Sequence, residues 1–113
     1  MNYQVIDLGL GCQLIQPYDE SGYYCVICAK SHGDRCMYYS DGQPVHDFIC
    51  PDCRMHPGFD DTPDEKDGLT QEQYVARYRR GWLDSVGWDE ECVRRLRSVF
   101  EMSDDDIDTI RTA

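Results

Sequence analysis

Four cysteines in two closely spaced pairs are the residues most able to do chemistry. Cys25 and Cys28 form one Cys-x-x-Cys pair, Cys50 and Cys53 form a second, and 21 residues lie between the pairs. Two residues between cysteines let the backbone reverse so that both sulfurs face one point about 2.3 Å away. Thiolates are soft ligands that select zinc or iron over magnesium or calcium. The spacing therefore predicts one metal site with four thiolate ligands.

The segment between the two pairs has the composition of a hairpin. Residues 35–39 and 44–49 are rich in side chains that favour strands, and residues 40–43 favour a turn. We expect two strands here, which carry the chain from the first cysteine pair to the second.

Residues 22–54 resemble the zinc-ribbon, or rubredoxin-like, group of folds. Rubredoxins are similar in the aromatic residue before the first pair and in the Cys-Pro-x-Cys form of the second pair. The resemblance implies a ribbon held by one metal ion. Each knuckle of that group usually ends in glycine, whereas Ala29 and Arg54 stand at those positions here. This departure favours one structural zinc ion over iron that transfers electrons.

Other possible metal ligands occur in the same half of the chain, namely Cys12, His32, Cys36, His46 and His56. A two-metal site of the RING-like kind would need Cys36 and His46 together with a further cysteine pair, which is missing. We expect the extra cysteines to be small buried thiols and the histidines to lie at the surface or beside the ligands. Seven cysteines, an odd number with metal-site spacing, argue against a disulfide scaffold.

The net charge of the chain indicates which class of partner it can bind. The 113 residues include 22 acidic and 11 basic side chains, a net charge of −11, and a four-thiolate zinc site adds two formal negative charges. This balance argues against binding to nucleic-acid phosphates and favours a protein partner with a basic surface. The sequence has no apolar run of membrane-spanning length and no signal-peptide pattern at its start, so we expect a cytoplasmic location.

The first half of the chain is expected to form a β and zinc-ribbon domain over residues 1–58. Short strands at residues 3–8 and 12–16, joined by Gly9-Leu10-Gly11, should form a hairpin that packs on the ribbon, and a polar turn should follow at residues 17–22. Residues 59–68 carry five acids and one lysine, which predicts an acidic linker.

Residues 69–113 are expected to form three helices. Thr70, Asp89 and Ser103 are good N-cap residues, and Gln73 completes a capping box with Thr70. The first helix should cover residues 71–86. The apolar stripes of the three helices are Val75, Tyr78, Trp82 and Val86, then Cys92, Val93, Leu96, Val99 and Phe100, then Ile107 and Ile110. The fold class predicted is α+β.

Two sets of charged residues are candidates for partner binding. The acidic set comprises Asp60, Asp61, Asp64, Glu65, Asp67, Asp104, Asp105, Asp106 and Asp108. Carboxylates in such an array could imitate duplex phosphates and compete for a basic nucleic-acid groove. The alternative is a nucleic-acid-binding or transcription regulator that uses the arginines of the first two helices, Arg77, Arg79, Arg80, Arg94, Arg95 and Arg97. Pairing of these arginines with neighbouring acids is the expectation that does not involve nucleic acid.

The function expected is non-enzymatic. The sequence has no glycine-rich phosphate loop, nucleophile elbow or His-Glu-x-x-His helix, and four cysteines would leave a zinc ion no open coordination position. Phage-encoded inhibitors, including some anti-CRISPR and anti-restriction proteins, are similar in size and charge, with no shared motif. A phage anti-defence role is therefore the narrower form of the expectation.

Overall fold

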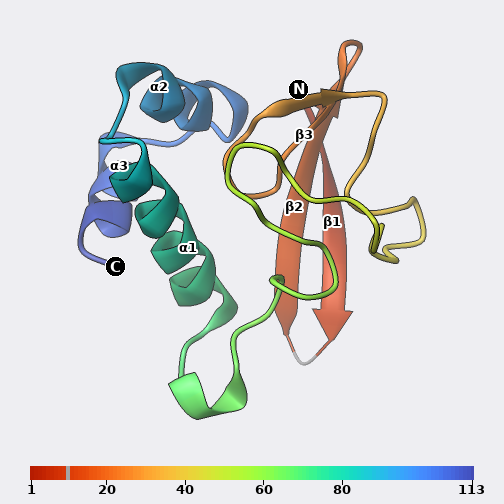
Figure 1. The fold of residues 1–113 in the computed structure, drawn as a ribbon, viewed down its shortest axis with the longest axis horizontal. Coiled ribbons are helices and arrows are strands. Elements are labelled where there is room, and N and C mark those ends of the chain that lie inside the picture. The colour runs from red at the N-terminus through yellow and green to blue at the C-terminus, as the bar shows by residue number, and fades with distance from the viewer. Residues whose placement is uncertain (10) are drawn as a thin grey trace.

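The computed structural model describes residues 1–9 and 11–113, which form a four-stranded antiparallel sheet followed by three helices (Figure 1). The strands are β1 (Asn2–Gly9), β2 (Cys12–Asp19), β3 (Gly22–Tyr24) and β4 (Ser31–Gly33), and they lie in this order across the sheet. The helices are α1 (Gln71–Ser85), α2 (Glu90–Val99) and α3 (Asp104–Arg111), with a short 3₁₀ helix at Glu65–Asp67. The expected α+β class is confirmed. Leu10, in the expected turn of residues 9–11, lies outside the described residues.

The first two strands pair over most of their length. Val5 pairs with Ile15, and the next pair, Ile6 with Leu14, points to the opposite face and is buried. The expected turn at residues 17–22 is too long, because β2 continues to Asp19 and that residue pairs with Gly22 of β3. The turn between β2 and β3 therefore consists of only Glu20 and Ser21.

The two strands expected at residues 35–39 and 44–49 are not present; a single bridge joins Tyr38 to Pro44. Two backbone hydrogen bonds flank this bridge, from the Tyr39 N–H to the Gln43 carbonyl at 2.9 Å and from the Val45 N–H to the Met37 carbonyl at 2.8 Å, so the expected hairpin is reduced to its turn end. The buried side chain of Gln16 bonds to the other side of residues 37–38. Its Oε1 accepts hydrogen bonds from the backbone N–H groups of Met37 and Tyr38, at 2.8 and 3.1 Å, and its Nε2 donates to the Tyr38 carbonyl at 2.9 Å. These backbone groups are satisfied by one side-chain amide and need no neighbouring strand.

All three helices begin at the predicted N-cap residues. Thr70 and Gln73 form a reciprocal capping box, Asp89 accepts from the N–H groups of Glu91 and Cys92, and Ser103 caps α3 with Asp106 as its reciprocal partner. α1 ends one residue before the predicted limit, with Val86 as C-cap and Gly87 beyond it at φ +66°. Each start is stabilised by groups within three residues, which is why the sequence predicts it well.

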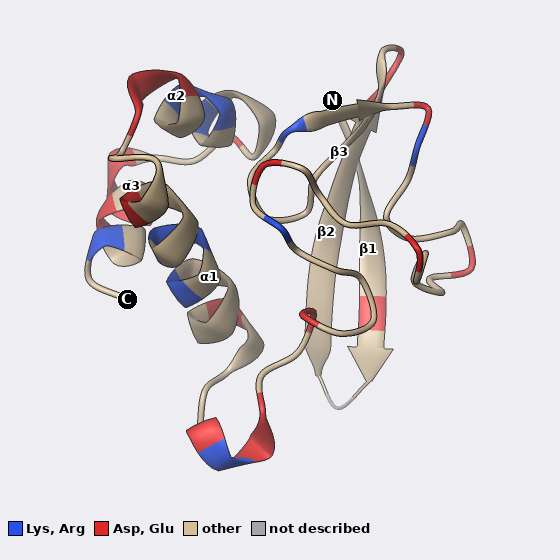
Figure 2. Ribbon diagram, in the orientation of Figure 1, with Lys and Arg blue, Asp and Glu red and all other residues tan. Residues whose placement is uncertain are grey.

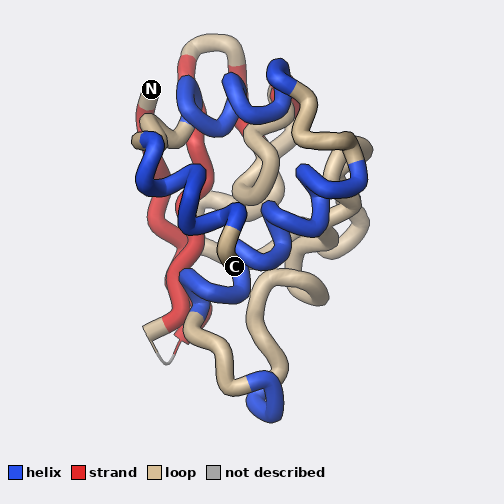
Figure 3. Tube along the Cα trace, turned by 90° about the vertical axis from the view of Figure 1, so that its left-hand side faces the viewer, coloured by secondary structure: helices blue, strands red, loops and turns tan. Residues whose placement is uncertain are grey.

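The helices lie along one side of the sheet and loops, and α3 packs against α1 (Figures 1 and 3). Leu83, Leu96 and Ile107 of the helices join Ile6 and Leu14 of the sheet in one continuous cluster of buried side chains, to which the four cysteines also belong. The two halves of the chain are therefore in contact. The division at residues 58 and 68 stays a prediction.

Candidate metal centre

The two Cys-x-x-Cys segments fold into knuckles of the same geometry. In the first, the Cys25 N–H donates to the Lys30 carbonyl at 2.9 Å and the Ala29 N–H donates to the Cys25 carbonyl at 3.1 Å. In the second, the Cys50 N–H donates to the Met55 carbonyl at 3.0 Å and the Arg54 N–H donates to the Cys50 carbonyl at 2.9 Å. Both knuckles thus reverse the chain immediately after their second cysteine.

The residue after each second cysteine adopts a left-handed backbone conformation. Ala29 has φ +63° and Arg54 has φ +66°. These are the two positions at which zinc ribbons and rubredoxins usually carry glycine, and a side chain there costs roughly 1 kcal/mol. Both residues therefore have a backbone conformation that glycine would adopt without strain, although neither is glycine.

The four sulfurs converge on one point. All four Sγ atoms lie within 4.8 Å of one another, with 3.5 Å from Cys25 to Cys53 and 3.6 Å from Cys28 to Cys50. Four thiolates at about 2.3 Å from one ion stand about 3.8 Å apart, whereas the sulfurs of a disulfide are about 2.05 Å apart. The separations fit a shared ion, and all four cysteines are free and buried.

The surroundings of the sulfurs disfavour several thiolates without a cation. Burial raises the pKa of Cys25 well above its usual value, and hydrogen bonding with Cys25 raises the pKa of Cys28. Several buried negative charges so close together repel one another strongly, and a bound divalent cation removes that cost. The Ile27 N–H, 3.4 Å from the Cys25 Sγ, and the His32 Nε2, 3.4 Å from the Cys50 Sγ, surround the cluster with polar partners.

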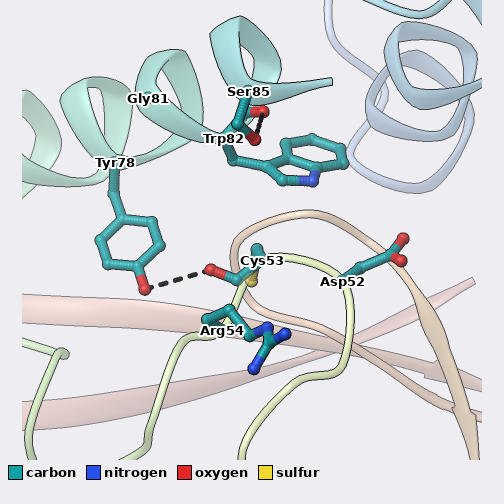
Figure 4. Close-up of a pocket in the computed structure, with 7 residues that line it drawn as sticks. All are labelled: Asp52, Cys53, Arg54, Tyr78, Gly81, Trp82 and Ser85. Atoms are coloured by element: carbon teal, nitrogen blue, oxygen red, sulfur yellow. Dashed lines mark hydrogen bonds between the residues drawn. The ribbon is translucent and has the colours of Figure 1, made fainter.

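α1 holds both knuckles with two consecutive side chains. Arg79 donates from Nε to the Ile27 carbonyl at 2.8 Å and from Nη2 to the Val26 carbonyl at 3.1 Å, and its guanidinium lies 4.5 Å from the centre of the Phe100 ring. The Tyr78 hydroxyl donates to the Cys53 carbonyl at 3.3 Å (Figure 4). Burial lowers the pKa of Arg79 to about 10, which leaves it charged at neutral pH.

α2 contributes a second arginine. Arg95 donates to the Asp52 carboxylate at 2.7 Å, and its guanidinium lies 5.4 Å from the Trp82 ring centre. Trp82 itself lies over the second knuckle (Figure 4). Arg79 and Arg95 thereby bring two positive charges close to a site that carries two negative charges when four thiolates hold one divalent ion.

The remaining arginines of the predicted basic clusters are mostly paired. Arg80 with Asp84, Arg94 with Glu91 and Arg97 with Asp104 form ion pairs at 3.8, 2.8 and 2.6 Å. The structure therefore shows the pairing with neighbouring acids that was expected as the alternative to nucleic-acid contact. Arg77 is exposed on α1.

The acidic residues proposed for partner binding occupy different environments. Asp61 is buried and accepts hydrogen bonds from the Tyr38 hydroxyl at 3.2 Å and the Gly58 N–H at 2.9 Å, while Asp60 accepts from the His56 N–H at 3.1 Å. The others are exposed: Asp64, Glu65 and Asp67 around the 3₁₀ helix, and Asp104, Asp105, Asp106 and Asp108 on α3. Figure 2 shows these two exposed groups at separate places.

The additional cysteine and histidine candidates do not assemble a second centre. Within residues 1–9 and 11–113, the four cysteines are the one group of three or more such side chains whose ligand atoms converge. His56 contacts the His46 carbonyl through Nε2, and both imidazoles pack against Phe59. Cys12 and Cys36 are half-buried.

Sequence reasoning missed the supporting roles of three residues, Gln16, Asp52 and Arg79. For Gln16 a signal exists, because it follows Leu14 at the inward-facing period of a strand. For Asp52 and Arg79 the sequence offers no comparable signal, since their partners lie 43 and 52 residues away along the chain.

A shallow surface pocket of about 350 Å³ lies between the second knuckle and α1, and its lining includes Arg54, Gly81, Trp82 and Ser85 (Figure 4). The Ser85 hydroxyl donates to the Trp82 carbonyl at 2.6 Å. This serine is therefore engaged in its own helix.

No protein-family model, curated protein or solved structure matches the chain. None of the helices in the described residues is both long enough and apolar enough to cross a membrane. The fold and the site together define an α+β protein with a four-cysteine cluster that could hold a metal ion.

Proposed function

We propose that the four cysteines hold one structural zinc ion and that the protein acts without catalysis, by binding a protein partner with a basic surface. The convergence of four buried sulfurs within 4.8 Å carries the first part. Four cysteine ligands complete a tetrahedral coordination sphere, which leaves no position for substrate or water. Iron remains the alternative ion for the same ligand set.

The distribution of charge supports the second part. The chain has a net charge of −11, and Arg79 directs its positive charge at knuckle carbonyls in the interior. Exposed carboxylates around the 3₁₀ helix and at the start of α3 can attract a basic surface, although Asp64 and Asp104 also form exposed ion pairs with Lys66 and Arg97. A cytoplasmic location is part of the proposal, because thiols stay reduced in that compartment.

The narrower form of the proposal is that the partner is a protein that handles nucleic acid. This chain would inhibit that partner by binding to it, as a phage anti-defence protein would. The narrower form rests on size and charge alone. The second candidate function, a regulator that binds nucleic acid through its arginines, is supported by exposed Arg77 and by the weakness of exposed ion pairs such as Arg94 with Glu91.

Metal analysis and a binding comparison test the proposal. Protein purified without added metal should contain about one zinc ion per chain. At 0.15 M salt it should bind immobilised protamine, a basic DNA-binding protein, and should not bind a 30-base-pair DNA duplex. Two triple variants locate the binding surface. One replaces Asp104, Asp105 and Asp106 with asparagine, and the other replaces Asp64, Glu65 and Asp67 with their amides. The variant that loses more affinity for protamine carries its substitutions in the binding surface. Equal losses would mean that net charge alone attracts protamine, and retention on the duplex would support the regulator instead.

A further inference from the structure

The N-terminal hairpin differs in charge from the rest of the molecule. Residues 1–18 contain one charged side chain, Asp7, although the chain has 22 acidic and 11 basic residues. In Figure 2 β1 accordingly shows a single charged band. Copies of a protein with a net charge of −11 repel one another over most of their surface, but the hairpin is nearly neutral.

The same hairpin exposes apolar side chains. Val5 and Ile15 pair across β1 and β2 on the face opposite the buried pair Ile6 and Leu14, and they are 57% and 46% exposed. Figure 3 shows the two strands at the margin of the molecule, with the loops on their other side. Tyr3 lies on the same face as Val5, and its hydroxyl donates to the Val99 carbonyl at 2.7 Å. This face of the hairpin therefore contacts α2 through the Tyr3 hydroxyl and is exposed at Val5 and Ile15.

β1 is also an edge strand. In the described residues its backbone N–H and C=O groups pair with β2 alone, while its Tyr3 and Gln4 side chains donate to the Val99 and Tyr39 carbonyls. Half of the N–H and C=O groups of an edge strand point away from the sheet, and proteins usually protect such edges with lysine, proline or a bulge. β1 contains no lysine or proline, and its irregularity lies between Asp7 and Gly9. From Asn2 to Ile6 the edge therefore carries none of these three features.

We propose that a second copy of this chain binds at this edge, with β1 of one copy antiparallel to β1 of the other about a two-fold axis near Val5. An antiparallel pair of identical strands is self-complementary, which a two-fold interface requires. The pairing extends each four-stranded sheet into one of eight strands, and it joins the Val5 and Ile15 side chains of both copies into one apolar strip.

The distribution of charge favours a second copy of the chain over a basic protein as the partner that binds at the β1 edge. A basic surface gains little attraction from a hairpin with one carboxylate, whereas two acidic molecules meet here with the least repulsion. An edge pairing buries less area than the roughly 1,200–2,000 Å² of a standard interface. The dimer should therefore depend on concentration, and it can coexist with partner binding at the helices.

Sedimentation equilibrium of the zinc-loaded full chain tests the proposal from about 5 to 500 µM at 0.15 M salt. We expect the mass to rise from 13.1 kDa to twice that value. Val5→Lys should weaken association at least tenfold, because the two-fold axis places the new ammonium groups of both copies side by side. The matched control, Val86→Lys, makes the same change at an exposed site at the end of α1 and should leave association unchanged. Both variants lower the net negative charge equally, so general repulsion cannot explain a difference.

Hydrogen exchange of the unmodified protein gives a readout that needs no variant. Outward-facing β1 amides should become protected as concentration rises, while the amides of α3 should not change. A chain that stays monomeric at 500 µM, a dimer that Val5→Lys leaves intact, or protection confined to other elements would each overturn the proposal. Zinc content confirms that Val5→Lys is folded, and Ile15→Lys on the same face serves in its place if it is not.

Discussion

The three helices and the two knuckles are stabilised in opposite ways. Each helix begins at a cap whose partners lie within three residues, as Thr70 and Gln73 show for α1. The knuckles instead bring together cysteines 22 to 28 residues apart, keep Ala29 and Arg54 in a left-handed conformation, and bury four groups that repel one another when ionised. Local groups are enough to start a helix, whereas the knuckles depend on support from distant parts of the chain and, in the proposed function, on an ion.

The contact between these regions is made by few side chains. Tyr78 and Arg79 of α1 bond to knuckle carbonyls, and Arg95 of α2 bonds to Asp52. The helical region therefore supplies hydrogen-bond donors that the knuckles lack within their own sequence. Mutations can test how far each region depends on the metal, on these donors and on its own backbone.

Loss of the metal should have the largest effect. Cys50→Ser removes one of four ligands, and structural zinc contributes on the order of 10 kcal/mol or more, which is comparable to the whole stability of a small domain. We expect the variant to lose its zinc and the native packing of both knuckles while it keeps much of its helical circular dichroism. Cys92→Ser, which alters a half-buried cysteine of α2, should retain about one zinc ion per chain. Full zinc binding by Cys50→Ser would refute the four-ligand site.

Removal of the Gln16 amide should have the next largest effect. Gln16→Leu keeps the size of the side chain but leaves two backbone N–H groups and one carbonyl without partners, which should cost roughly 3 kcal/mol. Urea unfolding of zinc-loaded protein measures the cost, with exposed Gln13→Leu on the same strand as control. Equal stability of the two variants would show that residues 37–38 do not depend on Gln16.

Gln16 also shows what could and could not be predicted from the sequence. The cysteine cluster and the helix starts follow from residues two or three apart, and the structure shows both. The strands expected at residues 35–39 and 44–49 were too long, because propensity does not tell how far two segments stay paired or that a distant amide bonds to the other side of one of them. The roles of Arg79 and Asp52 likewise depend on packing between segments that only the folded chain brings together.

Arg79 tests the contact between the two regions. Arg79→Met retains most of the apolar stem but removes both donors to the first knuckle, so two carbonyls lose partners and the Phe100 contact loses its charge. We expect a loss of about 2 kcal/mol in unfolding free energy. The control Arg77→Met changes an exposed residue of the same helix and should be nearly neutral. If chelator removes zinc faster from Arg79→Met than from Arg77→Met, the helix also stabilises the metal-bound knuckle.

The smallest expected effect is a gain in stability, and it compares the backbone of a knuckle with the backbone of a helix. Arg54 is exposed and has φ +66°, a conformation that glycine adopts without strain, so Arg54→Gly should stabilise the zinc-loaded protein by roughly 0.5–1 kcal/mol despite the more flexible unfolded chain. The same substitution in α2, Arg94→Gly, should instead destabilise by about 1 kcal/mol, because glycine is unfavourable inside a helix. Thermal unfolding of both variants at saturating zinc measures the two signs. If Arg54→Gly also destabilises, the arginine side chain makes a contribution at the knuckle larger than the strain of its backbone, and the glycine usual in rubredoxins would not suit this chain.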